Sequence, residues 1–316
     1  MSVIHSASPE QIRSESLQPL LRPKMPELDV IRGIASLAVL FYHGLYYARD
    51  LTVFSPAQKH LLFVFSPGQF GVNLFFVLSG FLITGLLLDS RTRPDYYRRF
   101  YVRRALRILP AYYAILLILV LTRATSIGFL GMSFFYCANL SLLFGIAMSY
   151  PVLWSLAVEE HFYLFWPTIV HRLSMRWLAL FAGAIVIASP LFRFACVLHS
   201  LHTDPLKSGC FYYTWDNADG LACGALLSIA VRAFRFSRKR VLQLSLLCLA
   251  LALVVTLAGV PYGILTRQTK VGSALQCVPW NIGFAGIIGL SVLIGASRWK
   301  AAVAPPVLIF FGNISY

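Results

Sequence analysis

Long apolar stretches separated by short polar segments fill nearly the whole chain. A helix needs about 20 residues to cross the hydrocarbon core of a bilayer. Eight stretches approach that length, and a ninth begins near residue 303 and runs to the end of the sequence. The pattern predicts an all-α fold, a polytopic transmembrane helical bundle with nine visible spans. The eight complete stretches are residues 30–48, 69–88, 108–122, 152–170, 177–198, 215–233, 241–260 and 278–296.

A further apolar stretch, residues 129–148, has no clear assignment from hydropathy, and the basic residues decide it. The most basic part of the chain, SRTRPDYYRRFYVRRALR at 90–107, is called the arginine-rich segment below. Lysine and arginine gather on the cytoplasmic side of membrane proteins. If 129–148 does not cross, the basic segments at 171–176 and 231–240 share the cytoplasmic side with the arginine-rich segment. We therefore predict a cytoplasmic N-terminus and an outward-facing, non-spanning helical segment at 124–150.

The two ends of the chain differ in character. Residues 1–26 are polar and are predicted to form a disordered cytoplasmic tail. Residues 27–316 are predicted to form one transmembrane domain. Because the sequence stops at FFGNISY, directly after an apolar stretch, we expect it to be truncated before a last helix.

Composition and charge support the membrane assignment. The chain is 58% hydrophobic and 12% charged, whereas soluble proteins average about 45–50% apolar and about 25% charged residues. A net charge of +15 would permit nucleic-acid binding. Since the basic residues lie in clusters between apolar stretches, we instead expect contact with membrane lipids and no nucleic-acid partner. The six cysteines form no C-x-x-C pair, so no metal site is predicted.

Ionisable residues within apolar spans are costly and mark candidate sites. The first such segment is DVIRGIASLAVLFYHG at 29–44, where Arg32 and His43 are eleven positions apart. On a helix they share one face and lie roughly 16 Å apart along the axis. A simpler interpretation pairs Arg32 with Asp29 near the inner headgroups and leaves His43 as a hydrogen-bonded residue at the helix end.

The second segment is WSLAVEEHFYLFWP at 154–167, which carries two adjacent glutamates and a histidine. Ser155 and Glu159 share a helix face, and Glu160 points about 100° away. A glutamate here could be only a structural partner for an arginine, but two carboxylates beside His161 favour a functional site.

The third segment is RRALRILPAYY at 103–113, within which Arg103, Arg104 and Arg107 lie at the inner mouth of a span. Arginine binds phosphate oxygens through two parallel N–H groups, so the segment is a candidate phosphate clamp. Orientation of the protein and binding of anionic lipid are equally good explanations.

The fourth segment is DNADGLACGALLS at 216–228. Asp219 lies near the outer start of a span, either in a site or as a helix cap. Gly220 and Gly224 would let helices approach closely.

Together these segments resemble the acyltransferase 3 family of integral membrane acyltransferases. The resemblance covers roughly residues 27–316. It implies ten transmembrane helices in the inner (plasma) membrane, an acyl-CoA donor (acetyl-CoA expected) at the cytoplasmic face, and a hydroxyl acceptor on a cell-surface or exported carbohydrate or lipid-linked glycan. No permanently bound cofactor is implied. The motifs are LDVIRGIASLAVLFYHG (28–44), FGVNLFFVLSGFLIT (70–84), RRALRILPAYY (103–113), WSLAVEEHFYLFWP (154–167), DGLACGALLS (219–228) and the terminal FGNISY.

The resemblance also assigns residues. The family's first-helix arginine and histidine fall on Arg32 and His43, and the serine and glutamate of its S-x3-E motif fall on Ser155 and Glu159. Asn73 stands where family members often carry an acid. Expected catalytic residues are His43, Glu159 and Arg32. Expected donor-binding residues are Arg32, Arg103, Arg104 and Arg107. Expected substrate-binding or structural residues are Ser155, Asn73, Ser79, Glu160 and Asp219.

The resulting hypothesis is that the arginines bind the phosphates of coenzyme A while its thioester reaches toward His43. Imidazole, with an unperturbed pKa of about 6.5, can take a proton from the acceptor hydroxyl near neutral pH. Glu159 would orient the imidazole. An acyl-histidine intermediate is a weaker alternative. The competing hypotheses are a transporter or flippase for a polar lipid or glycan and, less favoured, a structural subunit.

Overall fold

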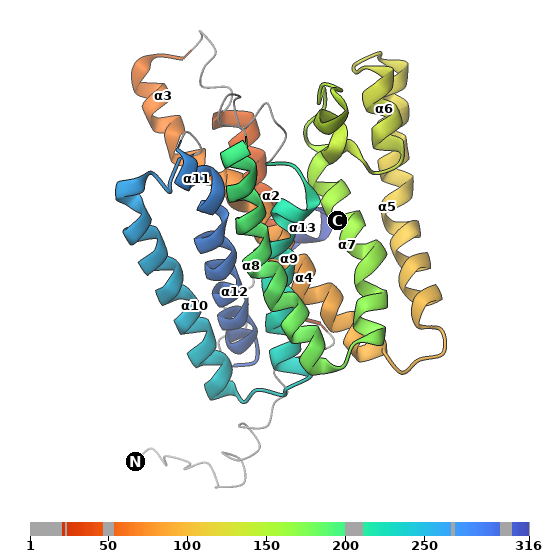
Figure 1. The fold of residues 1–316 in the computed structure, drawn as a ribbon, viewed down its shortest axis with the longest axis vertical. Helices are drawn as coiled ribbons and strands as arrows, with labels where there is room; N and C mark the ends of the chain where they lie inside the picture. The colour runs from red at the N-terminus through yellow and green to blue at the C-terminus, as the bar shows by residue number, and fades with distance from the viewer. Residues whose placement is uncertain are drawn as a thin grey trace, which may run out of the picture.

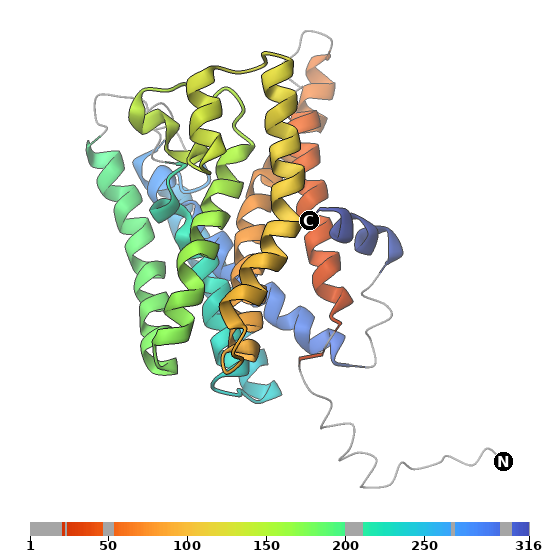
Figure 2. The same cartoon turned by 90° about the vertical axis from the view of Figure 1, so that its right-hand side faces the viewer.

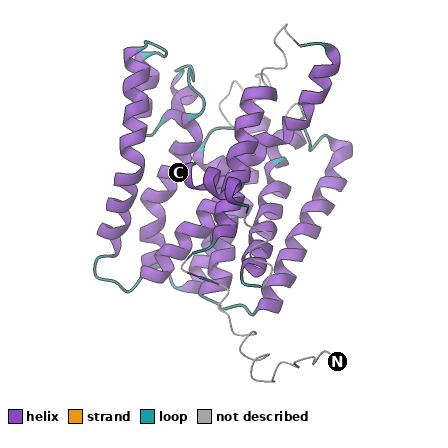
Figure 3. Cartoon of the chain, turned by 180° about the vertical axis from the view of Figure 1, so that it is seen from behind, coloured by secondary structure: helices purple, strands orange, loops and turns teal. Residues whose placement is uncertain are grey.

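The computed structural model describes residues 21–22, 24–46, 54–199, 211–266, 269–297 and 305–315. Within these residues the chain forms helices and loops and no strand (Figure 3). The predicted all-α fold is therefore confirmed. Most of the predicted tail, residues 1–26, lies outside the described residues.

The helices pack side by side as a bundle (Figure 1). Short helices directly precede or follow several of the long ones, for example η1 after α2 and η3 before α4. The elements in chain order are α2 (Pro26–Phe41), η1 (Tyr42–Tyr46), α3 (Pro56–Leu62), η3 (Phe63–Phe70), α4 (Gly71–Ser90), α5 (Tyr96–Leu121), α6 (Ile127–Phe134), η4 (Ala138–Phe144), α7 (Leu153–Arg172), α8 (Met175–His199), α9 (Thr214–Arg232), α10 (Arg238–Gly259), η5 (Val260–Tyr262), α11 (Lys270–Leu275), α12 (Cys277–Gly295) and α13 (Pro306–Ile314).

Six helical stretches of the described residues are long and apolar enough to cross a membrane. The prediction of nine spans is thus not confirmed. Two of the other three predicted spans, 152–170 and 215–233, are the helices α7 and α9, whose polar residues lower their hydropathy. The third, expected to begin near residue 303, is α13, a helix of only nine residues that packs against α2.

Helix α9 lies at the centre of the bundle and packs against α4 and α8. Glycines bring α4 and α9 into close contact. A Cβ on Gly80 would collide with the backbone of Leu221, and a Cβ on Gly224 would collide with the backbone of Val77 and Phe81. The close packing that the sequence suggested for Gly224 is therefore present, and it fixes α9 in the interior.

The basic segments lie at one end of the bundle. The loops joining α4 to α5, α7 to α8 and α9 to α10 meet there (Figure 1). Arg91 donates to the carbonyl oxygens of His171 and Leu173 at 3.0 and 2.7 Å, and Arg232 pairs with Asp89 at 3.3 Å. We call this end the arginine end. The charge rule assigns it to the cytoplasm, which stays a prediction.

At the opposite end, the ambiguous residues 129–148 form no helix of membrane length. They contain most of α6, eight residues long, and η4, a 3-10 helix of seven residues. Ser126 caps α6 by accepting a hydrogen bond from the Phe129 N–H. The two short helices fold over the ends of α5 and α7 (Figure 2). The described residues 129–148 thus hold no helix of membrane length, as predicted, and their outward-facing position stays a prediction. We call α6 and η4, with the turn between them, the α6–η4 cover.

Candidate active site

Glu159 joins two helices inside the bundle. Its Oε1 accepts a hydrogen bond from the Ser79 hydroxyl of α4 at 2.8 Å, and its Oε2 accepts one from the Tyr163 hydroxyl at 3.1 Å. Tyr163 lies four residues after Glu159, so the two share a face of α7. Both carboxylate oxygens are thus hydrogen-bonded to hydroxyl groups.

Two arginines approach this carboxylate from different helices. The Arg104 guanidinium of α5 lies 4.4 Å from the centroid of the Tyr163 ring, a cation–π distance. The charges of Arg104 and of Arg32 on α2 both act on Glu159. Arg32 is 7% exposed and donates to Asp29 at 3.0 Å, as the i,i+3 spacing predicts. Ser79, Glu159, Tyr163, Arg104 and Arg32 together are called the Glu159 cluster.

His43 occupies a different position. It belongs to the π-helical turn η1, is exposed, and places Nδ1 2.9 Å from the Val39 carbonyl oxygen. Its ring meets Tyr42 edge-on, with 5.1 Å between centroids. The hydrogen-bond partners of Glu159 are Ser79 and Tyr163, so orientation of His43 by Glu159 stays a prediction.

The serine of the S-x3-E pattern does not bind the glutamate in this structure. Ser155 Oγ lies 3.4 Å from the Val152 carbonyl oxygen of its own helix, and the serine on Glu159 is Ser79. Tyr163 was not predicted as a site residue. The i,i+4 spacing of Tyr163 from Glu159 was the sequence signal that could have identified it. No local sequence signal predicts the contact between Ser79 and Glu159, which are 80 residues apart.

The arginine end has a cavity of about 350 Å³ beside the start of α5, lined by Asp95, Arg98, Arg99, Val102 and Arg103. Of the three arginines predicted to form a phosphate clamp, only Arg103 lines it. Arg104 turns to Tyr163 instead, because successive residues point about 100° apart on a helix. Arg107 is exposed further along α5. Arg98 and Arg99 were not predicted as donor-binding residues, although Arg99 and Arg103 are i,i+4.

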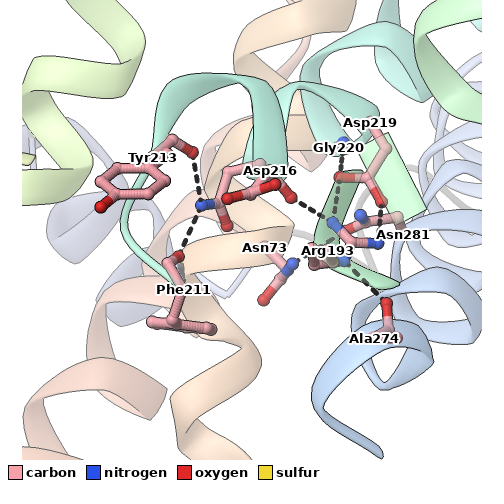
Figure 4. A network of polar contacts seen from close by, with 10 residues as sticks. Asn73, Arg193, Phe211, Tyr213, Asp216, Asp219, Gly220, Ala274 and Asn281 are labelled. Carbon is pink, nitrogen blue, oxygen red and sulfur yellow. Dashed lines mark hydrogen bonds and ion pairs between the residues drawn. The ribbon is translucent and has the colours of Figure 1, made fainter. Parts of the chain in front are cut away.

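Asp219 and Asn73 lie in a second buried polar network (Figure 4). Asp219 of α9 receives two hydrogen bonds from Arg193 of α8, at 2.8 and 3.2 Å. Arg193 also donates to the carbonyl oxygens of Ala274, at 2.8 Å, and Asp216. Asn73 donates to Asn281 at 3.0 Å. These contacts join α4 to α12 and α8 to α9 and α11, so they indicate a structural role for Asp219 and Asn73.

Comparison with known proteins identifies the family. Residues 25–316 match the family model described as an acyltransferase domain. The chain is 31% identical over 180 residues to the peptidoglycan O-acetyltransferase OatA of Listeria monocytogenes serovar 1/2a, covering 49% of this chain and 25% of the relative. It is 32% identical over 245 residues to the putative peptidoglycan O-acetyltransferase YrhL of Bacillus subtilis, covering 68% of this chain and 35% of the relative.

A putative O-acetyltransferase of Staphylococcus aureus is 33% identical over 171 residues, covering 48% of this chain and 25% of the relative. The matched part of the chain thus spans about a third or less of these relatives' own length. No solved structure matches significantly. The family match extends over nearly all of the multi-pass helical bundle, so this chain belongs to the acyltransferase family that the domain defines.

Proposed function

We propose that this protein transfers an acyl group, with acetyl expected, from acyl-CoA at the cytoplasmic face to a carbohydrate hydroxyl at the outer face. The observation that supports this most is the Glu159 cluster. It places a carboxylate, two hydroxyls and two arginines inside a membrane bundle, where polar groups need a functional or structural reason. Two relatives, a peptidoglycan O-acetyltransferase and a putative one, favour the same chemistry.

The donor enters at the arginine end. Arg98, Arg99 and Arg103 line its cavity, and their guanidinium groups suit the phosphate oxygens of coenzyme A. The cavity, about 350 Å³, is at the small end of ligand pockets and would take the phosphate-bearing part of the donor. The pantetheine arm then extends between the helices toward Arg104 and Arg32.

In the transfer step the acceptor hydroxyl loses its proton to His43, the candidate base. Its oxygen attacks the thioester carbonyl carbon, and the C–S bond breaks. Coenzyme A leaves as a thiolate and recovers the proton from the imidazolium, which yields an O-acyl ester and a free thiol. Arg32 and Arg104 supply positive charge near the path of the thioester, and Glu159 with Ser79 and Tyr163 holds that charge in place.

The test uses membranes that contain the full chain, with acetyl-CoA as donor and cell-envelope carbohydrate from cells lacking the gene as acceptor. Free thiol is followed over time, and O-acetyl ester on the carbohydrate is measured by mass spectrometry. We expect equal amounts of thiol and ester from the wild type, and a loss of both in His43→Ala at matched expression. Carbohydrate translocated without thiol release would refute acyl transfer and favour the flippase.

A further inference from the structure

The α6–η4 cover and the facing side of α7 hold polar atoms that the Glu159 cluster does not use. Five buried oxygen atoms in this part of the described structure have no hydrogen-bond partner: Glu160 Oε1, Tyr136 Oη, Asn139 Oδ1, Ser133 Oγ and Ser141 Oγ. Ser133, Asn139 and Ser141 are 0% exposed. Buried polar groups are normally paired, so five unpaired oxygens in one region indicate a place for a hydrogen-bonding guest.

Glu160 of α7 lies near Tyr136 of the α6–η4 cover. The Tyr136 ring stacks on Tyr112 of α5, with 4.2 Å between centroids and 16° between planes. The Glu160 carboxylate acts electrostatically on both phenols. Burial and then the charge of Glu160 raise the pKa of the Tyr136 hydroxyl, so it stays protonated and can donate a hydrogen bond.

The backbone of Tyr136 ends helix α6 in a left-handed conformation. Its φ of 57° is in the left-handed region, which residues other than glycine rarely adopt. The turn is fixed by N–H groups of Tyr136 and Cys137 that donate to the carbonyl oxygens of Ser133 and Met132, at 2.9 and 2.8 Å. These two bonds are the usual cap at the end of an α-helix, here α6, and they fix the point from which the Tyr136 side chain projects.

Asn139 is positioned by helices α7 and α9. Its Nδ2 donates to the Thr214 hydroxyl at 2.9 Å, and His161 Nδ1 lies 2.6 Å from the same oxygen. These contacts use the amide nitrogen and leave Oδ1 as an acceptor without a partner. His161 is the residue after Glu160, so these contacts tie Asn139 to the turn of α7 that carries Glu160.

We propose that Glu160, Tyr136 and Asn139 bind the hydroxyl groups of the carbohydrate acceptor, beneath the α6–η4 cover. This inference rests on the proposed function and names its acceptor site. Glu160 Oε1 and Asn139 Oδ1 accept hydrogen bonds from sugar hydroxyls, and the Tyr136 phenol donates one to a sugar oxygen. Adjacent residues on α7 point about 100° apart, so Glu159 contacts the donor-side cluster while Glu160 contacts the acceptor.

The test measures binding and turnover separately on the full chain in lipid nanodiscs. The probe is a soluble peptidoglycan fragment without O-acetyl groups, titrated by calorimetry in the absence of acetyl-CoA. We expect saturable binding by the wild type. Tyr136→Phe should raise the Kd about tenfold, equivalent to about 1.4 kcal/mol, and Glu160→Gln should raise it at least as much. The matched control is Tyr113→Phe, which removes a phenol that already donates to the Phe134 carbonyl oxygen at 3.2 Å.

Each outcome decides the question. No saturable binding by the wild type, or equal Kd values for the wild type and both site variants, overturns the acceptor site, since the oxygens would then hold only water. A rise in the acetyl-CoA Kd as large as that in the fragment Kd also overturns it, because it would indicate a general structural defect. Fragment binding that depends on Tyr136 and Glu160 without any thiol release would support the site and refute the proposed transfer.

Discussion

The Arg193–Asp219 pair and the Glu159 cluster both bury charge in the bundle, but the buried charges have different hydrogen-bond partners. Asp219 receives two direct hydrogen bonds from Arg193, and every guanidinium nitrogen of Arg193 donates to the protein. Glu159 contacts hydroxyl groups instead, while one of its arginines lies on an aromatic ring and the other donates to Asp29. A direct ion pair fixes helices, whereas hydroxyl-linked charges can change partners when a substrate arrives.

The strongest test of this difference is removal of Arg193 or Asp219. Breaking a buried ion pair leaves an uncompensated charge and costs about 3–5 kcal/mol. We expect Asp219→Asn to lower the thermal unfolding midpoint in detergent, with activity lost only in proportion to the folded fraction. The double variant R193M/D219L should recover most of the stability. Full stability of Asp219→Asn would show that the pair is not structural.

The second test is Glu159→Gln, which keeps the size of the side chain and removes its charge. We expect at least about a hundredfold loss of acyl transfer with an unchanged unfolding midpoint, measured by thiol release and by thermal unfolding. Ser291→Ala is the control, because its hydroxyl donates only within α12. Loss of stability without loss of specific activity would indicate that Glu159 has a structural role, like the Arg193–Asp219 pair.

The third test separates the two faces of the arginine-rich segment. Arg103→Ala should raise the apparent KM for acetyl-CoA about tenfold, the loss of a charge-assisted hydrogen bond. Arg104→Ala should lower kcat instead, because its guanidinium lies at Tyr163. Arg176→Ala removes an exposed charge from the same end, outside the cavity, and controls for net charge. Equal effects of all three variants would indicate membrane electrostatics alone.

The smallest expected effect distinguishes two serines. Ser79→Ala removes a hydroxyl on Glu159 and should lower kcat about fivefold, near 1 kcal/mol. Ser155→Ala should have the smaller effect, because its hydroxyl is directed to its own helix. Initial rates at saturating acetyl-CoA measure both. The reverse order would restore the S-x3-E pairing.

The sequence by itself determined the features that depend on neighbouring residues. Apolar length predicted where the helices lie, and the distribution of basic residues predicted that 129–148 does not span. The Asp29–Arg32 pair followed from i,i+3 spacing. Helical periodicity also predicts that Arg103 and Arg104 point in different directions and that Glu159 and Tyr163 share a face, because each residue turns the helix by about 100°.

Only the tertiary structure decided which distant groups meet. Ser79 reaches Glu159 across 80 residues and Asn73 reaches Asn281 across 208. No local pattern encodes these pairs, because helix packing and the close approach of α4 and α9 at Gly80 and Gly224 set them. The same packing gave Asp219 its arginine and buried Glu160 Oε1 and Tyr136 Oη without hydrogen-bond partners, since burial depends on which helices enclose an atom.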